Sequence, residues 1–462
     1  VRTARTAEAR FLRAFAYFNM VKRYGGVPLI LKAQQLSDSP EELYPKRATE
    51  EAVYQFILDE MNDIIDNRLL PDAYGAADLG RPTLYAAAAL KSRAAMYAGS
   101  IASWGTVQLD GLVGIPADKK EHFWQESLNA SNRLLYGSPF ALYEKYPDDR
   151  SKNYRNIFLD ENNCEVIFSE IYDGKSGKGH SWDMWQNPSG YNAWAGGQQN
   201  CVYLEFVESY ENIDGSDPTI DREKVAQYYT WTLDELWGKK DPRFKASIYT
   251  QGTPWTHEGA SVTLDYHVGI FVDGQWINDG FYEGVPALGV CANNWRPTPF
   301  GILKYLDESS AMIPERYYSK TDWIVFRLGE IYLNFAEAAF ELNKPDSALW
   351  AVNKIRARAG MPELQSITRE QIRHERKIEL AFEGNRYWDV RRWRTAVQDL
   401  SHAWHGMRYK LDWATQKYYV EIVDNICGTP EPYFNEMHYY WPIAQSRTQQ
   451  NPNLLPNNPG WR

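Results

Sequence analysis

The first third of the chain shows the spacing of apolar residues that is typical of amphipathic helices. In residues 8–24 three phenylalanines lie three or four positions apart, and the pattern stops at the Gly-Gly-Val-Pro run of residues 25–28. Thr49 is placed to cap a second helix. An alanine-rich segment and the segment after it predict two further helices that pack closely. The helices expected in the N-terminal part, residues 1–137, cover residues 8–24, 49–66, 83–100 and 123–135.

A second helical region is predicted from residue 322 to about residue 400. Its first part resembles one degenerate tetratricopeptide unit, in which bulky residues on one helix meet small residues where helices cross. Pro345 ends the first helix and suits the first turn of the next, and Gly360 stops that second helix. The residues that fit the repeat are Tyr332, Phe335, Ala336 and Ala348, whereas Ala339 and Val352 replace preferred aromatic residues. Residues 321–400 are therefore predicted as helices of the same scaffold.

Between these helical regions, residues 138–320 contain more Gly, Pro, Asn and Trp and only short apolar runs, such as 165–169 and 267–272. Such a segment predicts loops with short strands and a few helices. Loops on a rigid frame are where binding residues usually lie. Residues 401–462 predict an irregular tail packed on the scaffold. The predicted fold class is mainly α, with a helical-repeat scaffold and a loop-rich subdomain that contains short strands.

Composition narrows the class of protein. The 462 residues carry a formal net charge of −10 with a pI near 5.5, so the chain lacks the basic field of a nucleic-acid-binding protein. The absence of a charge-free apolar run of membrane-spanning length argues against an integral membrane protein. Four widely spaced cysteines form no CxxC pair, which leaves one or two disulfides open. No signal peptide is visible before the first helix, so we expect a truncated or processed chain.

Seven sequence blocks, spread over nearly the whole chain, carry a family resemblance. They are EARFLRAFAYFNMVKRYGGVPLI at 8–30, LPDAYGAADLGRPTLYAAAALKSRAAMYAGS at 70–100, VESYENIDG at 207–215, DPRF at 241–244, FRLGEIYLNFAEA at 326–338, ERKIELAFEGNRYWDVRRW at 375–393 and YYWPIAQSRTQQNPNLLPNNPGW at 439–461. By these blocks the chain closely resembles the SusD/RagB family of outer-membrane nutrient-binding lipoproteins. Several blocks in the right order are more specific than any single motif.

The resemblance implies a cell-surface lipoprotein with about four tetratricopeptide-like helix pairs and a variable, loop-rich ligand-binding subdomain. Its implied partners are an oligosaccharide or polysaccharide and a SusC-like TonB-dependent transporter, over which such a protein sits as a lid. The implied location is the outer membrane, through an N-terminal lipid anchor. The lipidated Cys and the segment that precede the residue 8 block in the family are absent from this sequence, so the anchor is inferred from the resemblance alone. The resemblance implies no catalysis.

Candidate binding residues follow from the chemistry of sugars, whose apolar C–H faces are ringed by hydroxyls. Such ligands are bound by flat aromatic rings beside planar polar side chains. Residues 180–200 have this composition within a loop rich in Gly and Asn. One or two of the indoles could anchor the loop, and we expect at least one aromatic ring to face the ligand. The candidates here are Trp182, Asp183, Trp185, Asn187, Tyr191 and Trp194.

A second candidate cluster lies between residues 275 and 296. The family resemblance implies that this region supplies sugar-stacking aromatic rings. For the two indoles, a ligand-stacking role and a structural role are equally favoured. The candidates here are Trp276, Tyr282, Asn294, Trp295 and Arg296, with Trp104 as a weaker candidate elsewhere.

The richest charged cluster lies in residues 375–392. Glu375, Glu379 and Glu383 recur at i, i+4 and i+8 and would share one helix face, and paired carboxylates could suggest glycosidase chemistry. The resemblance favours ion pairs that bridge scaffold helices instead. The eight histidines show no metal-ligand spacing and no EF-hand spacing supports calcium, so we assign no catalytic residue, no metal ligand and no cofactor.

Three functions therefore compete. The first is non-catalytic glycan binding that delivers substrate to the transporter. The second is a glycoside hydrolase with two carboxylates facing each other across a cleft. The third is peptide capture, either on a tetratricopeptide scaffold or by a RagB-like uptake protein. The many tryptophans in the loops favour the first.

Overall fold

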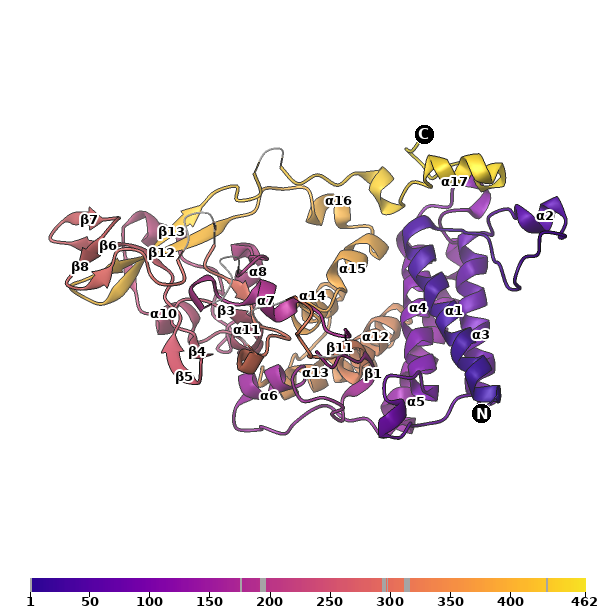
Figure 1. Cartoon of the computed structure of the whole chain (residues 1–462), viewed down its shortest axis with the longest axis horizontal. Helices are drawn as coiled ribbons and strands as arrows, with labels where there is room; N and C mark the ends of the chain where they lie inside the picture. Colours follow the sequence, from indigo (N-terminus) through magenta and orange to yellow (C-terminus); the bar gives the residue numbers. More distant parts are fainter. Residues whose placement is uncertain are drawn as a thin grey trace.

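The computed structural model describes residues 2–174, 177–191, 197–292, 296, 298–310, 316–428 and 431–462. The molecule is elongated, with long helices at one end and a β-sheet at the other (Figure 1). The N-terminal helices stand side by side at the right of the view, and the helices of residues 328–392 occupy the centre. The predicted class, mainly helical with small sheets, is confirmed.

Four long helices form the N-terminal end: α1 Arg2–Tyr24, α3 Glu50–Asp66, α4 Leu84–Trp104 and α5 Lys120–Gly137. Thr49 and Thr83 cap α3 and α4, each accepting a hydrogen bond from a backbone N–H of the first turn. Helices α4 and α5 pack closely where Gly99 meets the indole of Trp124, since a Cβ at Gly99 would lie 2.8 Å from the ring. The predicted helices are confirmed, and α4 extends as far as Trp104, the weaker binding candidate.

The central helices are α12 Leu328–Glu341, α13 Pro345–Ala359, α14 Arg369–Glu379 and α15 Arg386–Arg392. Helix α12 packs on α5 as well as on α13, so the two helical regions form one scaffold. Helix α13 ends at Gly360 with a φ of 79°, as predicted. Helix α14 ends at Glu379, so the expectation that Glu375, Glu379 and Glu383 share one helix face is wrong for Glu383. The chain leaves the helix there and turns at Gly384, whose φ is 76°.

Strand β11, Trp323–Arg327, precedes α12 and pairs antiparallel with β1, Val166–Glu170. The prediction of a helix from residue 322 onward is therefore wrong for residues 323–327. This Trp-Ile-Val-Phe run is rich in β-branched and aromatic residues, which favour strands. Its alternate residues Ile324 and Phe326 are buried. The ladder joins the loop-rich part of the chain directly to the helical scaffold.

The distal sheet has five strands in the order β2-β13-β12-β6-β7. Its strands are β2 Thr230–Trp231, β6 His267–Val272, β7 Gln275–Ile277, β12 Gly406–Asp412 and β13 Lys417–Val423. The prediction of an irregular tail is wrong for residues 406–423, because they form a hairpin in the middle of this sheet. Met407, Tyr409 and Leu411 alternate with half-buried Arg408 and Lys410, which is the period of a strand.

The remaining elements are short. The helices are α2 Pro40–Leu43, α6 Arg150–Asn156, α7 Trp182–Gln186, α8 Leu204–Glu208, α9 Arg222–Ala226, α10 Leu233–Trp237, α11 Pro242–Ser247, α16 Ala396–Asp399 and α17 Gln445–Gln450. The strands are β3 Ile248–Tyr249, β4 Pro254–His257, β5 Ala260–Thr263, β8 Phe281–Tyr282, β9 Val285–Pro286 and β10 Gly301–Ile302. After the sheet, the chain returns along the molecule to the N-terminal helices, where Arg47 donates a 2.7 Å hydrogen bond to Asn458 (Figure 1).

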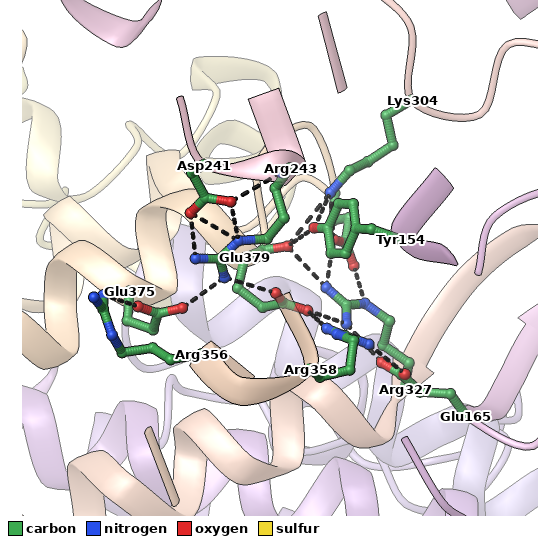
Figure 2. Close-up of polar contacts among 11 residues, drawn as sticks. Tyr154, Glu165, Asp241, Arg243, Lys304, Arg327, Arg356, Arg358, Glu375 and Glu379 are labelled. Carbon is green, nitrogen blue, oxygen red and sulfur yellow. Dashed lines mark hydrogen bonds and ion pairs between the residues drawn. The ribbon is translucent and has the colours of Figure 1, made fainter. Parts of the chain in front are cut away.

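A buried ion-pair network connects the central helices to the loop-rich part (Figure 2). At its centre, Glu379 of α14 accepts hydrogen bonds from Arg243 (2.9 Å), Arg327 (2.7 Å) and Arg358. Glu165, which precedes β1, accepts from the same Arg327 and Arg358 at 2.8 and 2.7 Å. All five side chains are at most 1% exposed. The implied role of this cluster, ion pairs that bridge scaffold elements, agrees with this geometry.

The cations of the network set the ionisation of its carboxylates. Burial alone would raise the pKa of Glu379, but the positive charges of Arg358, Arg327 and Arg243 hold this pKa well below its usual range. Glu383 pairs with Arg327 at 2.7 Å and with Lys304 at 2.9 Å. These carboxylates are therefore committed to structural ion pairs.

Neither a membrane span nor a metal cluster is present in the part of the chain that the structure describes. None of its helices combines the length and apolar character needed to cross a membrane. No group of three His, Cys, Asp or Glu side chains is placed there to hold a metal ion. The four cysteines are free thiols.

Candidate functional site

A pocket of about 430 Å³ lies between α7 and strand β11, where the loop-rich part meets the scaffold. Aromatic rings dominate its wall, and amide, hydroxyl and imidazole groups surround them. The aromatic lining residues are Tyr172, Trp182, Trp185, Tyr305 and Trp323, and the polar ones are His180, Ser181, Gln186, Gln199, Asn200 and Thr321. Such a surface can stack on the apolar face of a ligand while it hydrogen-bonds to hydroxyls at the edge.

Two of the lining indoles come from α7, three positions apart. The indole N–H of Trp182 donates a 3.1 Å hydrogen bond to the carbonyl of Lys304, and its ring is half-buried. The guanidinium of Arg316 lies 5.4 Å from the ring centroid of Trp185 and so covers part of one face. The pocket therefore has one indole anchored by a hydrogen bond and one held by a cation–π contact.

The back wall of the pocket rests on the buried ion-pair network. The rings of Tyr305 and Trp323 are stacked, with centroids 4.9 Å apart and planes at 26°. Tyr305 has a φ of 66°, a conformation that costs energy for a non-glycine residue and is maintained by its surroundings. The preceding residue, Lys304, turns its ammonium group away from the pocket toward Tyr154 at 2.8 Å and Glu383 at 2.9 Å. The ion-pair network thus fixes the backbone of residues 304 and 305. This backbone carries the Tyr305 ring, and its Lys304 carbonyl accepts the hydrogen bond from Trp182.

The side wall is formed by Tyr172 and His180, whose ring centroids lie 4.8 Å apart. The backbone N–H of Tyr172 donates a 3.0 Å hydrogen bond to the carboxylate of Asp322, which is 8% exposed. Burial raises the pKa of Asp322 to about 6, because the Tyr172 N–H offsets only part of the cost of removing the charge from water. Asp322 lies between Thr321 and Trp323, which both line the pocket.

Asp322→Asn is expected to stabilise the protein at neutral pH. The folded chain binds a proton at Asp322 more tightly than the unfolded chain, whose aspartates have a pKa of about 3.9. The free energy of unfolding of the wild type therefore falls as pH rises from about 4 to about 6. An asparagine does not ionise, so the variant does not lose this stability, and its amide oxygen still accepts the hydrogen bond from the backbone N–H of Tyr172. Thermal unfolding should show a higher Tm for the variant at pH 8 and a vanishing difference near pH 4. An equal or lower Tm at pH 8 would contradict this account, and exposed Asp118→Asn serves as the control.

Of the residues predicted from sequence, Trp182 and Trp185 line this pocket. Asp183 and Asn187 belong to the same segment but are fully buried, and the lining does not include them. The Asp183 carboxylate accepts a 3.0 Å hydrogen bond from the backbone N–H of Asp307, and its own N–H donates to Ser319 Oγ at 3.1 Å. These two hydrogen bonds connect α7 to the backbone of Asp307 and to the side chain of Ser319.

Tyr191 and Arg296 also lie away from the pocket lining. The Tyr191 ring packs 5.0 Å from the ring of His257. The guanidinium of Arg296 donates to the backbone carbonyls of Gly197 and Gln198. Three further candidates, Trp194, Asn294 and Trp295, lie outside the described residues.

Trp276 and Tyr282 lie at the distal end of the molecule, far from α7 (Figure 1). The indole of Trp276 on β7 contacts Phe271 and Tyr419, with centroids 4.9 and 5.3 Å apart. Tyr282 on β8 packs edge-on against Trp413 at 5.1 Å. The structure therefore does not bring the two predicted clusters together. The weaker candidate, Trp104, lies under the guanidinium of Arg373 at 4.8 Å.

Three aromatic rings and three amides of the pocket are not among the residues predicted from sequence. These residues are Tyr172, Tyr305, Trp323, Gln186, Gln199 and Asn200. Trp323 lies in the region predicted as helical scaffold, and Tyr172 and Tyr305 come from segments more than 130 residues apart. The one signal in the sequence was the position of Gln186, Gln199 and Asn200 within the same Trp-rich segment.

Comparison with known proteins identifies the family to which the chain belongs. The sequence profile of the SusD family matches residues 164–461, which is well over half of the chain. The chain belongs to the SusD family. A second profile, described as starch-binding associating with outer membrane, matches residues 2–96. The family resemblance that the sequence blocks indicated is therefore confirmed.

Among SusD family relatives, a SusD-like protein from Bacteroides ovatus is 23% identical over 417 residues, covering 88% of this chain and 63% of the relative. SusD-like protein P25 from Formosa agariphila is 24% identical, covering 99% of this chain and 73% of the relative. The crystal structure of a SusD-like protein from Bacteroides fragilis superposes with a TM-score of 0.75 at 26% identity, covering 99% of this chain and 80% of the other. The chain thus spans 63% to 80% of the length of these relatives.

Proposed function

We propose that this SusD family chain is a non-catalytic carbohydrate-binding protein of the cell surface. It would pass an oligosaccharide to a SusC-like TonB-dependent transporter in the outer membrane, where a lipid anchor would hold it. The family description starch-binding associating with outer membrane supports this proposal. So do the names of structural neighbours, which include a SusD-like carbohydrate binding protein from Bacteroides fragilis and a laminarin binding SusD-like protein.

The observation that carries the proposal is the chemistry of the pocket between α7 and β11. Four partly exposed aromatic rings, Tyr172, Trp182, Trp185 and Trp323, offer faces to the apolar side of a sugar, and buried Tyr305 supports them from behind. The exposed amides Gln199 and Asn200 supply donors and acceptors for its hydroxyls. A volume of about 430 Å³ falls within the roughly 300–1,000 Å³ typical of ligand pockets. We therefore assign the ligand to Trp182, Trp185 and Trp323, and keep Trp276 and Tyr282 as a proposed separate contact surface.

The same lining supports binding without catalysis. Glycoside hydrolysis requires two carboxyl groups about 5 to 10 Å apart across the bound sugar. Among the described lining residues none is Asp or Glu. The buried carboxylates behind the pocket, Glu379 and Glu383, are engaged by arginine and lysine.

Trp185→Ala is expected to weaken carbohydrate binding at least tenfold, which corresponds to about 1.4 kcal/mol. The variant removes the ring that Arg316 covers in part. Trp185 is preferred to Trp182 for this test because Trp182→Ala would break the hydrogen bond to the carbonyl of Lys304. A glycan array identifies the ligand, and isothermal titration calorimetry then compares the variant with the wild type. Circular dichroism and an unchanged Tm establish that the variant is folded.

Trp276→Ala is the matched tryptophan variant at the distal sheet. If only Trp185→Ala loses carbohydrate affinity, the result supports the pocket as the binding site. If only Trp276→Ala loses affinity, the binding site lies at the distal sheet instead. Binding of mixed oligopeptides in preference to sugars would replace the proposal by peptide capture. Release of shortened glycan during prolonged incubation would contradict the non-catalytic role.

A further inference from the structure

Residues 316–319 lie beside the pocket and are bonded through their backbone to two residues that line it. Ser319 and His180 exchange two backbone hydrogen bonds of 2.9 and 3.1 Å. The backbone N–H of Tyr317 donates to Ser181 Oγ at 3.0 Å. His180 and Ser181 both line the pocket, so these bonds place the backbone of residues 317–319 next to it.

Two glycines allow the segment to lie this close. A Cβ at Gly179 would lie 1.7 Å from the carbonyl oxygen of Tyr317, and a Cβ at Gly174 would lie 2.4 Å from that of Tyr318. Backbone atoms cannot move aside as a flexible side chain can, so larger residues at either position would push the segment away from the pocket. The close approach holds residues 317 and 318 against the pocket wall.

The two tyrosines of this segment are strongly exposed despite their fixed backbone. Tyr317 is 64% exposed and Tyr318 is 51% exposed. Tyr317 has a φ of 70°, a costly conformation for a non-glycine residue that persists only where the surroundings impose it. Neighbouring aromatic residues on a rigid backbone can offer a large contact area at a low cost in conformational entropy.

We propose that Tyr317 and Tyr318 form an outer part of the carbohydrate site and contact sugar rings that extend beyond the pocket. This inference rests on the proposed function. The ligand class is then an extended oligosaccharide or an internal stretch of a polysaccharide, bound along its length. The pocket volume of about 430 Å³ is near the lower end of the range for ligand pockets, so it holds only part of a long chain. The tyrosines supply contacts for the rest.

The inference predicts an effect of ligand length. Malto- and laminari-oligosaccharides, graded from disaccharide to heptasaccharide, are titrated into the wild type and into the Tyr317→Ala/Tyr318→Ala double variant. The shortest ligand that binds should do so equally well to both proteins. The longest should bind the double variant roughly tenfold more weakly, a loss of about 1.4 kcal/mol. Trp185→Ala, in contrast, should weaken ligands of every length.

Two further variants make the test specific. Tyr317→Phe/Tyr318→Phe keeps the rings and should restore binding of long ligands, and Tyr228→Ala, which removes another highly exposed tyrosine, should change nothing. If the double variant does not fold, Tyr318→Ala alone is measured in its place. Wild-type affinity for every length in the double variant, or an equal loss at every length, overturns the inference. An absence of saccharide binding by the wild type overturns the proposed function as well.

Discussion

Glu379→Gln is expected to lower the free energy of unfolding by about 3–5 kcal/mol, because it leaves buried cations without their counter-charge. Three arginines donate to this carboxylate, and all are at most 1% exposed. A neutral amide keeps only one of the two acceptor oxygens and carries no charge, and its NH₂ group would face arginine donors. Urea unfolding of the wild type and the variant measures the loss.

The control is Asp72→Asn, which removes a surface carboxylate paired with Arg68 at 2.7 Å. That pair is about half exposed, so its loss should change the free energy of unfolding by less than about 1 kcal/mol. Ionised Glu379 contributes to the free energy of unfolding above about pH 4–5, because glutamates of the unfolded chain have a pKa of about 4.3. This contribution is lost as the pH falls through the lowered pKa of Glu379 in the folded protein. A Glu379→Gln variant as stable as Asp72→Asn would show that the network adds little to stability.

Trp124→Ala should also lower the free energy of unfolding by about 3–5 kcal/mol. The indole is 1% exposed, packs on the backbone at Gly99 and donates a 3.0 Å hydrogen bond to Ser103 Oγ. Because Gly99 brings α4 against this ring, truncation leaves a cavity that neither helix can fill without shifting. Chemical denaturation monitored by circular dichroism provides the measurement.

Tyr136→Ala on the same helix is the matched control. Its side chain is 69% exposed and stacks on Trp350, so its removal should cost less than about 1 kcal/mol. Equal losses for Trp124→Ala and Tyr136→Ala would mean that the α4–α5 contact is not a tightly packed part of the core.

The helical scaffold was largely predictable because its signals are local. Thr49 caps a helix through its own side chain, and Gly360 ends one because it adopts a positive φ. The hairpin of residues 406–423 has the alternation of a strand, yet its partners β2 and β6 lie more than 130 residues earlier in the sequence. Pairing over such a separation leaves no local signal of register.

The candidate site was predictable only in part, for a related reason. Trp182 and Trp185 were identified from the composition of one loop, which is a local property. Tyr305 and Trp323 reach the same pocket through the β1–β11 ladder and the ion-pair network, neither of which composition can indicate. Asp183 is a residue type that often binds sugar hydroxyls, but its side chain is fully buried and accepts a hydrogen bond from the backbone of Asp307. Asp307 lies more than 120 residues away in the sequence, so composition near residue 183 cannot indicate this burial.

The central position of the hairpin in the distal sheet has a consequence for the order of folding. Strands β2 and β6 are neighbours only through β12 and β13, so the sheet cannot close until residues 406–423 arrive. Closing so long a loop carries an entropic cost before any pairing compensates for it, which places sheet completion late in folding. Until then, β2 and β6 present unpaired edges that can bind strands of other chains. A fragment that ends before residue 406 should therefore aggregate, although it contains every residue that lines the pocket.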